Sequence, residues 1–314
     1  MEPSRCSVLA PERLQVETGG LQVVAGDWLA LDPARTPASR LRALAIVPRR
    51  TFFVRESVGR QTVPQPLAAN IDEALIVCGL DQELRAGRLE RYLALAWQGG
   101  ARPAVILTKV DTVSAAELEA ALRGTGELAP GAEVLAVSAV TGQGVPELAQ
   151  LLLTPGHTAA LLGPSGVGKS SLINALIGSD RLATGATRRD GKGRHTTTHG
   201  ELVLVPGGGV LLDTPGLRSL GLWDAGEGLQ QTFADVVEFA AGCRFSDCAH
   251  QSEPGCAVKT AVAAGTLDPA RVVRWRKLER ELESLAARQG DQQELAEAKR
   301  RWRQRSRGAR GRSL

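Results

Sequence analysis

Residues 1–62 alternate apolar and polar side chains, with turn residues between the alternating runs. Such runs occupy residues 14–17, 21–24, 27–31 and 51–55. A period of two is typical of half-buried β-strands, and helical periodicity is weak here. We therefore predict that residues 1–62 form a small β-barrel. A β-cap that binds no ligand remains the alternative.

From residue 66 the pattern changes to buried apolar runs that alternate with helical periodicity. The predicted strands are 74–78, 104–107, 133–137 and 158–162, and the predicted helices are 89–97, 145–153 and 171–177. Two further apolar runs, 201–205 and 210–212, surround three glycines and predict a hairpin. This alternation favours a doubly wound α/β domain over residues 66–222. The polar stretch 178–200 predicts a long loop, of a length that is usually functional or mobile.

After residue 225 the apolar positions follow a helical period. Leu229, Phe233 and Val236 share one face, and Val272, Trp275 and Leu278 share another. We predict a helical domain over residues 225–314, so the chain is multidomain.

A glycine-rich loop joins the predicted strand 158–162 to the helix that follows. Residues 163–170 fit the P-loop pattern G-x-x-x-x-G-K-[ST]. Its backbone N–H groups can turn toward phosphate oxygens, and the helix N-terminus adds partial positive charge. Lys169 is the predicted catalytic residue on the β- and γ-phosphates, and the Ser170 hydroxyl is a predicted Mg²⁺ ligand. The predicted phosphate-binding residues are Gly163, Ser165, Gly166, Val167, Gly168, Lys169, Ser170 and Ser171.

Thr108, Lys109 and Asp111 follow a buried strand and fit the guanine-reading pattern [NT]-K-x-D. The carboxylate of Asp111 can accept from the N1–H and 2-amino groups of guanine, whereas adenine would leave it unpaired. The stem of Lys109 would cover the ring. Ser138 and Ala139 follow the next strand, where a backbone N–H can meet guanine O6. With the P-loop, these residues predict GTP and GDP as ligands.

Two further segments suit Mg²⁺ and the γ-phosphate. Asp213 ends the second hairpin strand and is predicted to hold Mg²⁺ through water, and the N–H of Gly216 would sense the γ-phosphate. An ordinary Asp-x-Pro-Gly turn is the alternative. In the run 193–199, Thr197 is predicted to bind Mg²⁺ and the γ-phosphate and to assist catalysis.

The residue after the Asp-Thr-Pro-Gly run is Leu217, where many GTPases place the glutamine that orients water. Leucine cannot orient water, so either another residue does so or catalysis is slow until a partner helps. His195 is the nearest candidate for this catalytic role, and a solvent-facing loop histidine is the alternative.

The order of these segments is unusual. Regular G proteins run P-loop, switch I, DxxG, NKxD and SA, whereas this chain runs TKVD, SA, P-loop, switch I and DTPG. All five are present, and the chain resembles the circularly permuted GTPases. Because the site lies at the carboxyl ends of the strands, rejoining the ends elsewhere leaves it intact.

Four candidate metal ligands lie within fourteen residues. Cys243, Cys248, His250 and Cys256 form a thiolate-rich set that suits one structural Zn²⁺. Five cysteines in 314 residues are too few for a disulfide-stapled secreted protein.

Charge is concentrated at the end of the chain. Residues 299–312 hold eight Lys and Arg and no acidic residue; without these eight, the formal charge of +4 becomes −4. Such a stretch indicates a polyanionic partner, nucleic acid before membrane, or a solubilising end. With no signal-peptide pattern and no membrane-length apolar run, we expect a cytoplasmic protein.

The motifs GPSGVGKSSLIN, GRHTTT, DTPG, TKVD and CRFSDCAHQSEPGC, in this order of domains, resemble the ribosome small-subunit-dependent GTPases, the RsgA or YjeQ family. The resemblance covers nearly the whole chain. It implies an OB-fold over residues 1–62, a zinc-binding C-terminal domain and GTP hydrolysis in late maturation of the 30S subunit. It also implies stimulation by that subunit, contact with 16S rRNA, a monomer, and His195 as the catalytic residue.

The sequence also leaves two other functions open. One is a permuted GTPase of large-subunit assembly, although those lack the downstream zinc ligands. The other is a passive RNA-binding scaffold with a decayed nucleotide site, against which the five intact GTP segments argue.

Overall fold

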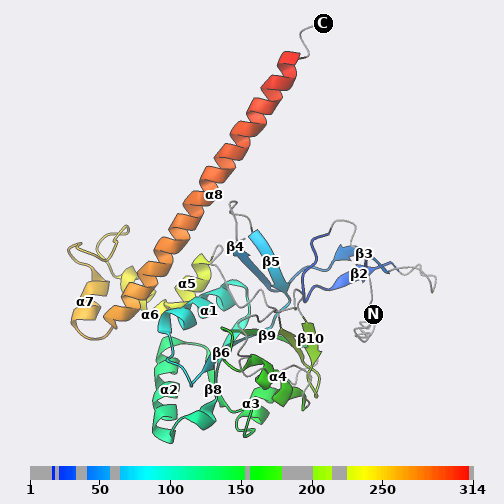
Figure 1. Ribbon diagram of the computed structural model, residues 1–314. Helices are drawn as coiled ribbons and strands as arrows, with labels where there is room; N and C mark the ends of the chain where they lie inside the picture. The colour runs from blue at the N-terminus through cyan, green and yellow to red at the C-terminus, as the bar shows by residue number, and fades with distance from the viewer. Residues whose placement is uncertain are drawn as a thin grey trace, which may run out of the picture.

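The computed structural model describes residues 16–17, 21–32, 41–56, 64–152, 156–178, 201–213 and 225–310, with only the backbone for residues 16–17, 41–42, 56, 201, 213, 289 and 291–310. Small β-sheets come first, a six-stranded α/β layer follows, and helices close the chain (Figure 1). The strands are β1 (Val16–Glu17), β2 (Leu29–Leu31), β3 (Leu41–Ile46), β4 (Phe52–Glu56), β5 (Pro64–Ala69), β6 (Glu73–Gly79), β7 (Arg102–Thr108), β8 (Glu133–Val137), β9 (Thr158–Leu162), β10 (Glu201–Leu204) and β11 (Val210–Asp213). The helices are α1 (Ala86–Gln98), the short 3-10 helix η1 (Val110–Thr112), α2 (Ala115–Leu128), α3 (Val145–Gln150), α4 (Lys169–Ile177), α5 (Gly226–Thr232), α6 (Ala234–Ala241), α7 (Ala257–Ala263) and α8 (Pro269–Arg310).

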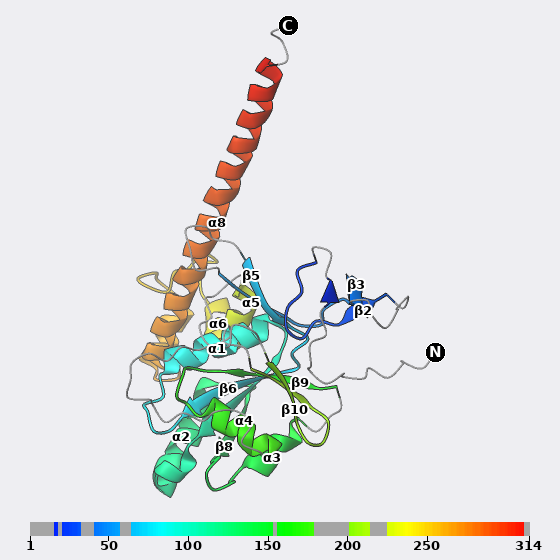
Figure 2. The same cartoon turned by 45° about the vertical axis from the view of Figure 1, so that its right-hand side comes forward.

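The six-stranded sheet has the order β10-β11-β9-β6-β7-β8. Every neighbouring pair is parallel except β10 and β11, which form the predicted hairpin. Strand β6 lies in the middle, where Leu75 faces one hydrophobic core and Ile76 the other. Helices α3 and α4 pack on the Leu75 face, and α1 packs on the opposite face (Figure 2). The predicted α/β alternation is confirmed, and five parallel strands end at one edge of the sheet.

The N-terminal strands form two small sheets among the described residues. Strands β1, β3 and β2 make one sheet, and β4 and β5 make an antiparallel pair that an isolated bridge between Ala25 and Ala68 joins to the segment before β2. The predicted strand at 21–24 is wrong. There the N–H of Val24 donates to the carboxylate of Asp27 at 2.8 Å, so it is not available to a strand ladder. Arg49 holds the same carboxylate at 2.7 Å.

The C-terminal helices pack on α1 rather than on a core of their own. Leu229, Phe233, Val272 and Trp275 are all buried in the hydrophobic cluster that contains α1, as the helical pattern predicted. Helix α8 then leaves the body and projects away from it (Figure 1). No helix in the described part of the chain has an apolar run long enough to cross a bilayer.

Buried charges join α8 to α1. Glu90 of α1 is fully buried and accepts from Arg271 at 3.1 Å and Arg274 at 2.7 Å. Arg271 also donates to Asp235 of α6 at 2.7 Å. Because each charge has a partner, the network can be buried between α1 and the C-terminal helices.

Candidate nucleotide and metal sites

The P-loop lies between β9 and α4, as predicted. Gly163, Gly166 and Gly168 have φ angles of 140°, 83° and 98°, a region that L side chains rarely adopt. A Cβ on Gly163 would also lie 2.6 Å from the carbonyl oxygen of Val77 in β6. The buried Lys169 donates from Nζ to the carbonyls of Gly163, at 2.8 Å, and Pro164. Its ammonium is therefore placed on the inner side of the loop.

The remaining predicted phosphate-binding residues lie on the same loop or in the first turn of α4. Ser165 and Gly166 are exposed, Val167 is buried, and Ser170 and Ser171 follow Lys169 at the helix N-terminus. A helix N-terminus that presents its backbone N–H groups suits phosphate binding.

The predicted base-reading residues contact the P-loop directly. The hydroxyl of Thr108 donates to the carbonyl of Val167 at 2.6 Å, and Nζ of Lys109 donates to the carbonyl of Gly166 at 2.8 Å. Lys109 has a left-handed backbone, with φ of 62°, which turns the chain from β7 into η1. These contacts join two segments that are nearly 60 residues apart in the chain and place the base-reading loop beside the phosphate-binding loop.

Asp111 and Ser138 come together from two different strands. The hydroxyl of Ser138 donates to Oδ1 of Asp111 at 2.5 Å. The same hydroxyl oxygen accepts from the N–H groups of Val140 and Thr141 at 3.2 and 3.1 Å, so Ser138 is held in place. Ala139 follows at the end of β8. The prediction that residues 108–111 and 138–139 lie together agrees with this geometry.

The predicted magnesium and switch residues are only partly described. Asp213 ends β11, which is parallel to the P-loop strand β9, so its backbone lies at the same sheet edge. His195, Thr197, Gly216 and Leu217 lie outside the described residues, and their roles stay predictions.

The four predicted zinc ligands converge. The ligand atoms of Cys243, Cys248, His250 and Cys256 all lie within 4.8 Å of one another. The two sulfurs of Cys243 and Cys256 are 3.9 Å apart, close to the edge of about 3.8 Å expected for a tetrahedral zinc thiolate site. Burial lowers the pKa of His250 and so favours the neutral imidazole that binds metals. The donor set and its spacing fit Zn²⁺.

The loop that carries these ligands is fixed by neighbours. The ring of His250 lies 5.3 Å from that of Trp275 in α8. The carboxylate of Glu253 accepts from the N–H groups of Ala249, Gln251 and Ser252 at 2.7–3.0 Å. The ligand loop is thereby attached to α8 and organised around one carboxylate.

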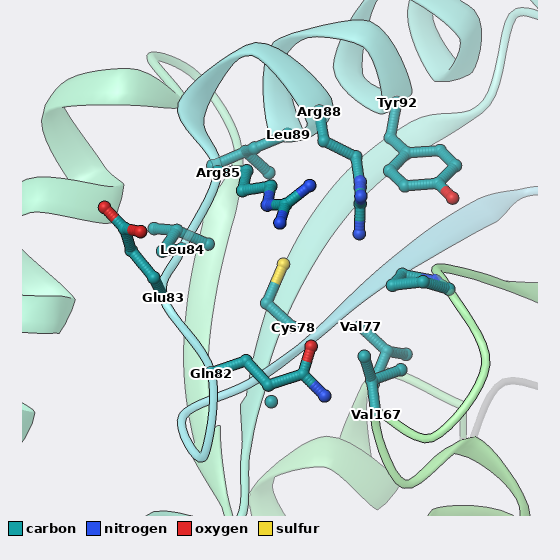
Figure 3. Close-up of a pocket in the computed structure, with 12 residues that line it drawn as sticks. Val77, Cys78, Gln82, Glu83, Leu84, Arg85, Arg88, Leu89, Tyr92 and Val167 are labelled. Carbon is teal, nitrogen blue, oxygen red and sulfur yellow. The ribbon is translucent and has the colours of Figure 1, made fainter.

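A small pocket lies between α1 and the P-loop (Figure 3). Cys78 of β6 points into it beneath Arg85 and Arg88, and Val167 of the P-loop forms part of its wall. Burial raises the pKa of Cys78 to about 11, so its thiol stays protonated near neutral pH. Cys78 is therefore unsuited to act as a nucleophile.

Sequence reasoning missed one residue that contacts the candidate nucleotide site. Asp81 follows β6, and its Oδ2 lies 2.6 Å from Nζ of Lys109. Its position after a buried parallel strand, at the edge where the motifs gather, was the available signal.

The fold and the site together define a class of protein. The strand before the P-loop lies beside strand β6 of a mostly parallel sheet. The base-reading loop at residues 108–111 precedes the P-loop in the chain and contacts it in space. This is the arrangement of a circularly permuted P-loop GTPase.

Comparison with known proteins narrows the class to a family. The sequence model of the RsgA GTPase family matches residues 46–223. The chain is 47% identical over 293 residues to the small ribosomal subunit biogenesis GTPase RsgA of Streptomyces avermitilis, covering 93% of this chain and 77% of that protein. It is 48% identical over 268 residues to the protein of the same name from Streptomyces coelicolor, covering 85% of this chain and 72% of that one. The crystal structure of YjeQ from Thermotoga maritima matches with a TM-score of 0.63 and 26% identity, covering 85% of this chain and 88% of that chain. The chain belongs to the RsgA GTPase family and is a GTP hydrolase.

Proposed function

We propose that this protein hydrolyses GTP during late maturation of the 30S ribosomal subunit in the cytoplasm, and that the small subunit stimulates the reaction. The observation that carries the proposal is the direct contact of the base-reading loop with the P-loop, through Thr108 and Lys109. The relatives named for small ribosomal subunit biogenesis, which share almost half of its residues, support the ribosomal part.

In this proposal the chain binds the nucleotide at both ends. Asp111, held by Ser138, accepts from the guanine edge, while the N–H of Ala139 meets O6 and the stem of Lys109 covers the ring. The N–H groups of residues 163 and 165–171 and the ammonium of Lys169 bind the phosphates. Preorganised donors at the γ-phosphate stabilise charge that develops as its bond to the leaving group breaks.

Mg²⁺ neutralises phosphate charge in such sites. Ser170, Thr197 and Asp213 would hold it, the last through water, and the N–H of Gly216 would sense the γ-phosphate. His195 would orient the attacking water, since Leu217 has no polar group to do so. Without a glutamine at position 217, hydrolysis would be slow in the absence of the small subunit. Orientation of the attacking water is then the step that the subunit would accelerate.

The parts of the chain outside the GTPase domain would serve recognition of the ribosome. We assign residues 1–62 to an OB-type barrel, residues 66–222 to the GTPase domain and residues 225–314 to a helical domain that binds one structural Zn²⁺ through Cys243, Cys248, His250 and Cys256. The basic residues of 299–312 would contact 16S rRNA phosphates, because such contacts supply most of the non-specific affinity for nucleic acid. The protein would act as a monomer.

The test is GTP hydrolysis across a titration of purified 30S and 50S subunits. We expect 30S subunits to raise turnover at least about tenfold, a lowering of the barrier by about 1.4 kcal/mol. The variant Lys169→Ala, in the same preparations, gives the background from contaminating GTPases. Stimulation by 50S alone would move the function to the large subunit. A rate equal to that background with and without subunits would favour a passive scaffold.

A further inference from the structure

Asp81 contacts the base-reading lysine from a neighbouring strand. It lies in the loop after β6, and its Oδ2 is 2.6 Å from Nζ of Lys109, which follows β7. The side chains are only 35% and 30% exposed. Nζ of Lys109 also donates to the carbonyl of Gly166. The ammonium is therefore bound on one side by a carboxylate and on the other by the P-loop.

Backbone contacts near this pair hold the loop after β6 beside the loop after β7. The N–H of Leu80 donates to the carbonyl of Thr108 at 2.9 Å. A Cβ on Gly79 would lie 2.6 Å from Oδ1 of Asp81, so the carboxylate folds back over a residue without a side chain. Glycine at this position thus leaves room for the carboxylate in the orientation that reaches Lys109.

We propose that Asp81 is a positioning residue for guanine-nucleotide binding, which holds the stem of Lys109 where the base is bound. The proposal rests on the function proposed above, since it takes Lys109 as the residue that covers guanine. A lysine side chain loses rotamer entropy when it is ordered. Ordering by Asp81 and Gly166 before the nucleotide arrives removes part of that cost from binding.

The contact between Asp81 and Lys109 lies on the base side of the site, and none of the phosphate-binding N–H groups takes part in it. Loss of Asp81 should therefore weaken GDP and GTP binding by the same factor. The carboxylate of Asp111 still reads the 2-amino group, so the preference for GDP over inosine diphosphate should not change.

The experiment is a double-mutant cycle on the full-length, zinc-loaded chain, with affinity for a fluorescent GDP and competition by GTP and inosine diphosphate. Asp81→Ala should raise the dissociation constants about fivefold, and Asp81→Asn, which keeps an acceptor oxygen, should restore part of the loss. In a Lys109→Ala background, Asp81→Ala should have no further effect. Glu83→Ala, an exposed carboxylate on the same loop, is the matched control and should bind as the unaltered chain does.

Circular dichroism and thermal unfolding of each variant separate lost folding from lost binding. An equal effect of Asp81→Ala with and without Lys109, or no effect at all, would overturn the positioning role while leaving the proposed function untouched. Failure of the unaltered chain to bind guanine nucleotides would overturn both. Absence of 30S stimulation with the cycle intact would overturn only the ribosomal function.

Discussion

At the scale of single residues, Asp111 carries the most specific chemistry of the site. Its carboxylate accepts from Ser138 at 2.5 Å, and an ionised carboxylate has further lone pairs for a ligand. In Asp111→Asn one acceptor becomes a donor, which suits the 2-oxo group of xanthine instead of the 2-amino group of guanine. We expect GTP affinity to fall at least about tenfold and xanthosine triphosphate to bind better than GTP. Competition against a fluorescent nucleotide measures both, with the exposed Glu127→Gln as control. Unchanged GTP affinity would refute the guanine assignment.

Glu253 is a single residue that organises the loop of the candidate zinc ligands. Hydrogen bonds from backbone N–H groups lower the pKa of Glu253 to about 2. The donors are its own N–H and those of Gln251, Ala249 and Ser252. It is therefore ionised at every pH where the protein would bind zinc. Glu253→Gln removes the charge and one acceptor, so the ligand loop should lose order and bind zinc about tenfold more weakly.

Competition with a chromophoric chelator measures this affinity. Glu238→Gln, an exposed carboxylate on α6, should leave it unchanged. Equal affinities for the two variants would mean that the hydrogen bonds of Glu253 do not organise the ligands.

The sequence predicted candidate site residues that belong to a short motif, and it missed residues whose partners lie far away in the chain. The P-loop, Asp111 and the zinc ligands each belong to a short motif whose spacing reflects the chemistry. Asp81 and Glu90 belong to none. Asp81 acts on Lys109, 28 residues away, and Glu90 pairs with arginines more than 180 residues away. Only the folded chain brings such partners together.

At the scale of elements, α1 is the helix that contacts the sheet, the P-loop pocket and α8. It borders the pocket beside the P-loop, packs on the sheet and holds α8 through Glu90. Glu90→Gln would leave the buried Arg271 and the partly buried Arg274 beside a neutral group. We expect a loss of about 2 kcal/mol in the free energy of unfolding. Urea unfolding at constant zinc measures it, and a change no larger than that of the exposed Glu119→Gln would contradict the role assigned to this network.

A second contact between α1 and α8 depends on pH. Arg91 donates two hydrogen bonds to Glu281, each at 2.6 Å. These bonds lower the pKa of Glu281 below its ordinary value of 4.5. The ionised form therefore stabilises the fold above pH 4.5, and this contribution is lost as the pH falls through the lowered pKa.

The variant Glu281→Gln should accordingly be less stable at neutral pH by about 1 kcal/mol or less, because the pair is partly exposed. The difference in melting temperature from the unaltered chain should shrink as the pH falls below 4.5. A difference that stays constant down to pH 3 would show that the charge of Glu281 is not the cause.

Elements with strong periodicity were predictable, and irregular ones were not. The buried strands β6, β7 and β9 and the helix α1 appear where apolar runs predicted them. Helix α2 was missed although Ser114 and Glu117 form a capping box at its start, because its apolar face is weak. The run at 21–24 alternates like a strand, but the local hydrogen bond to Asp27 competes with sheet pairing.

At the scale of the whole molecule, the most prominent feature is the far part of α8. The 25 residues from Ala286 to Arg310 span about 37 Å as a helix, and the basic residues of 299–310 lie at its end. Truncation after Ala298 should weaken rRNA binding and reduce the slope of log affinity against log salt by about 0.7–0.9 for each phosphate that the tail no longer neutralises. Filter binding across a salt series tests this, with hydrolysis in the absence of subunits as a control that should not change. An unchanged slope would make the tail a solubilising end.

The permuted order of the sheet also has a consequence during protein synthesis. Translation releases β6, β7 and β8 first, so the half of the sheet that carries the predicted base-reading loops can pair before the P-loop strand β9 exists. Until β9 emerges, one edge of β6 is open, and Thr108 and Lys109 lack the carbonyls of Val167 and Gly166. A nascent chain therefore gains its nucleotide site in a single late step, when β9 adds to that open edge, and an arrest before this step leaves an unpaired strand edge prone to aggregation.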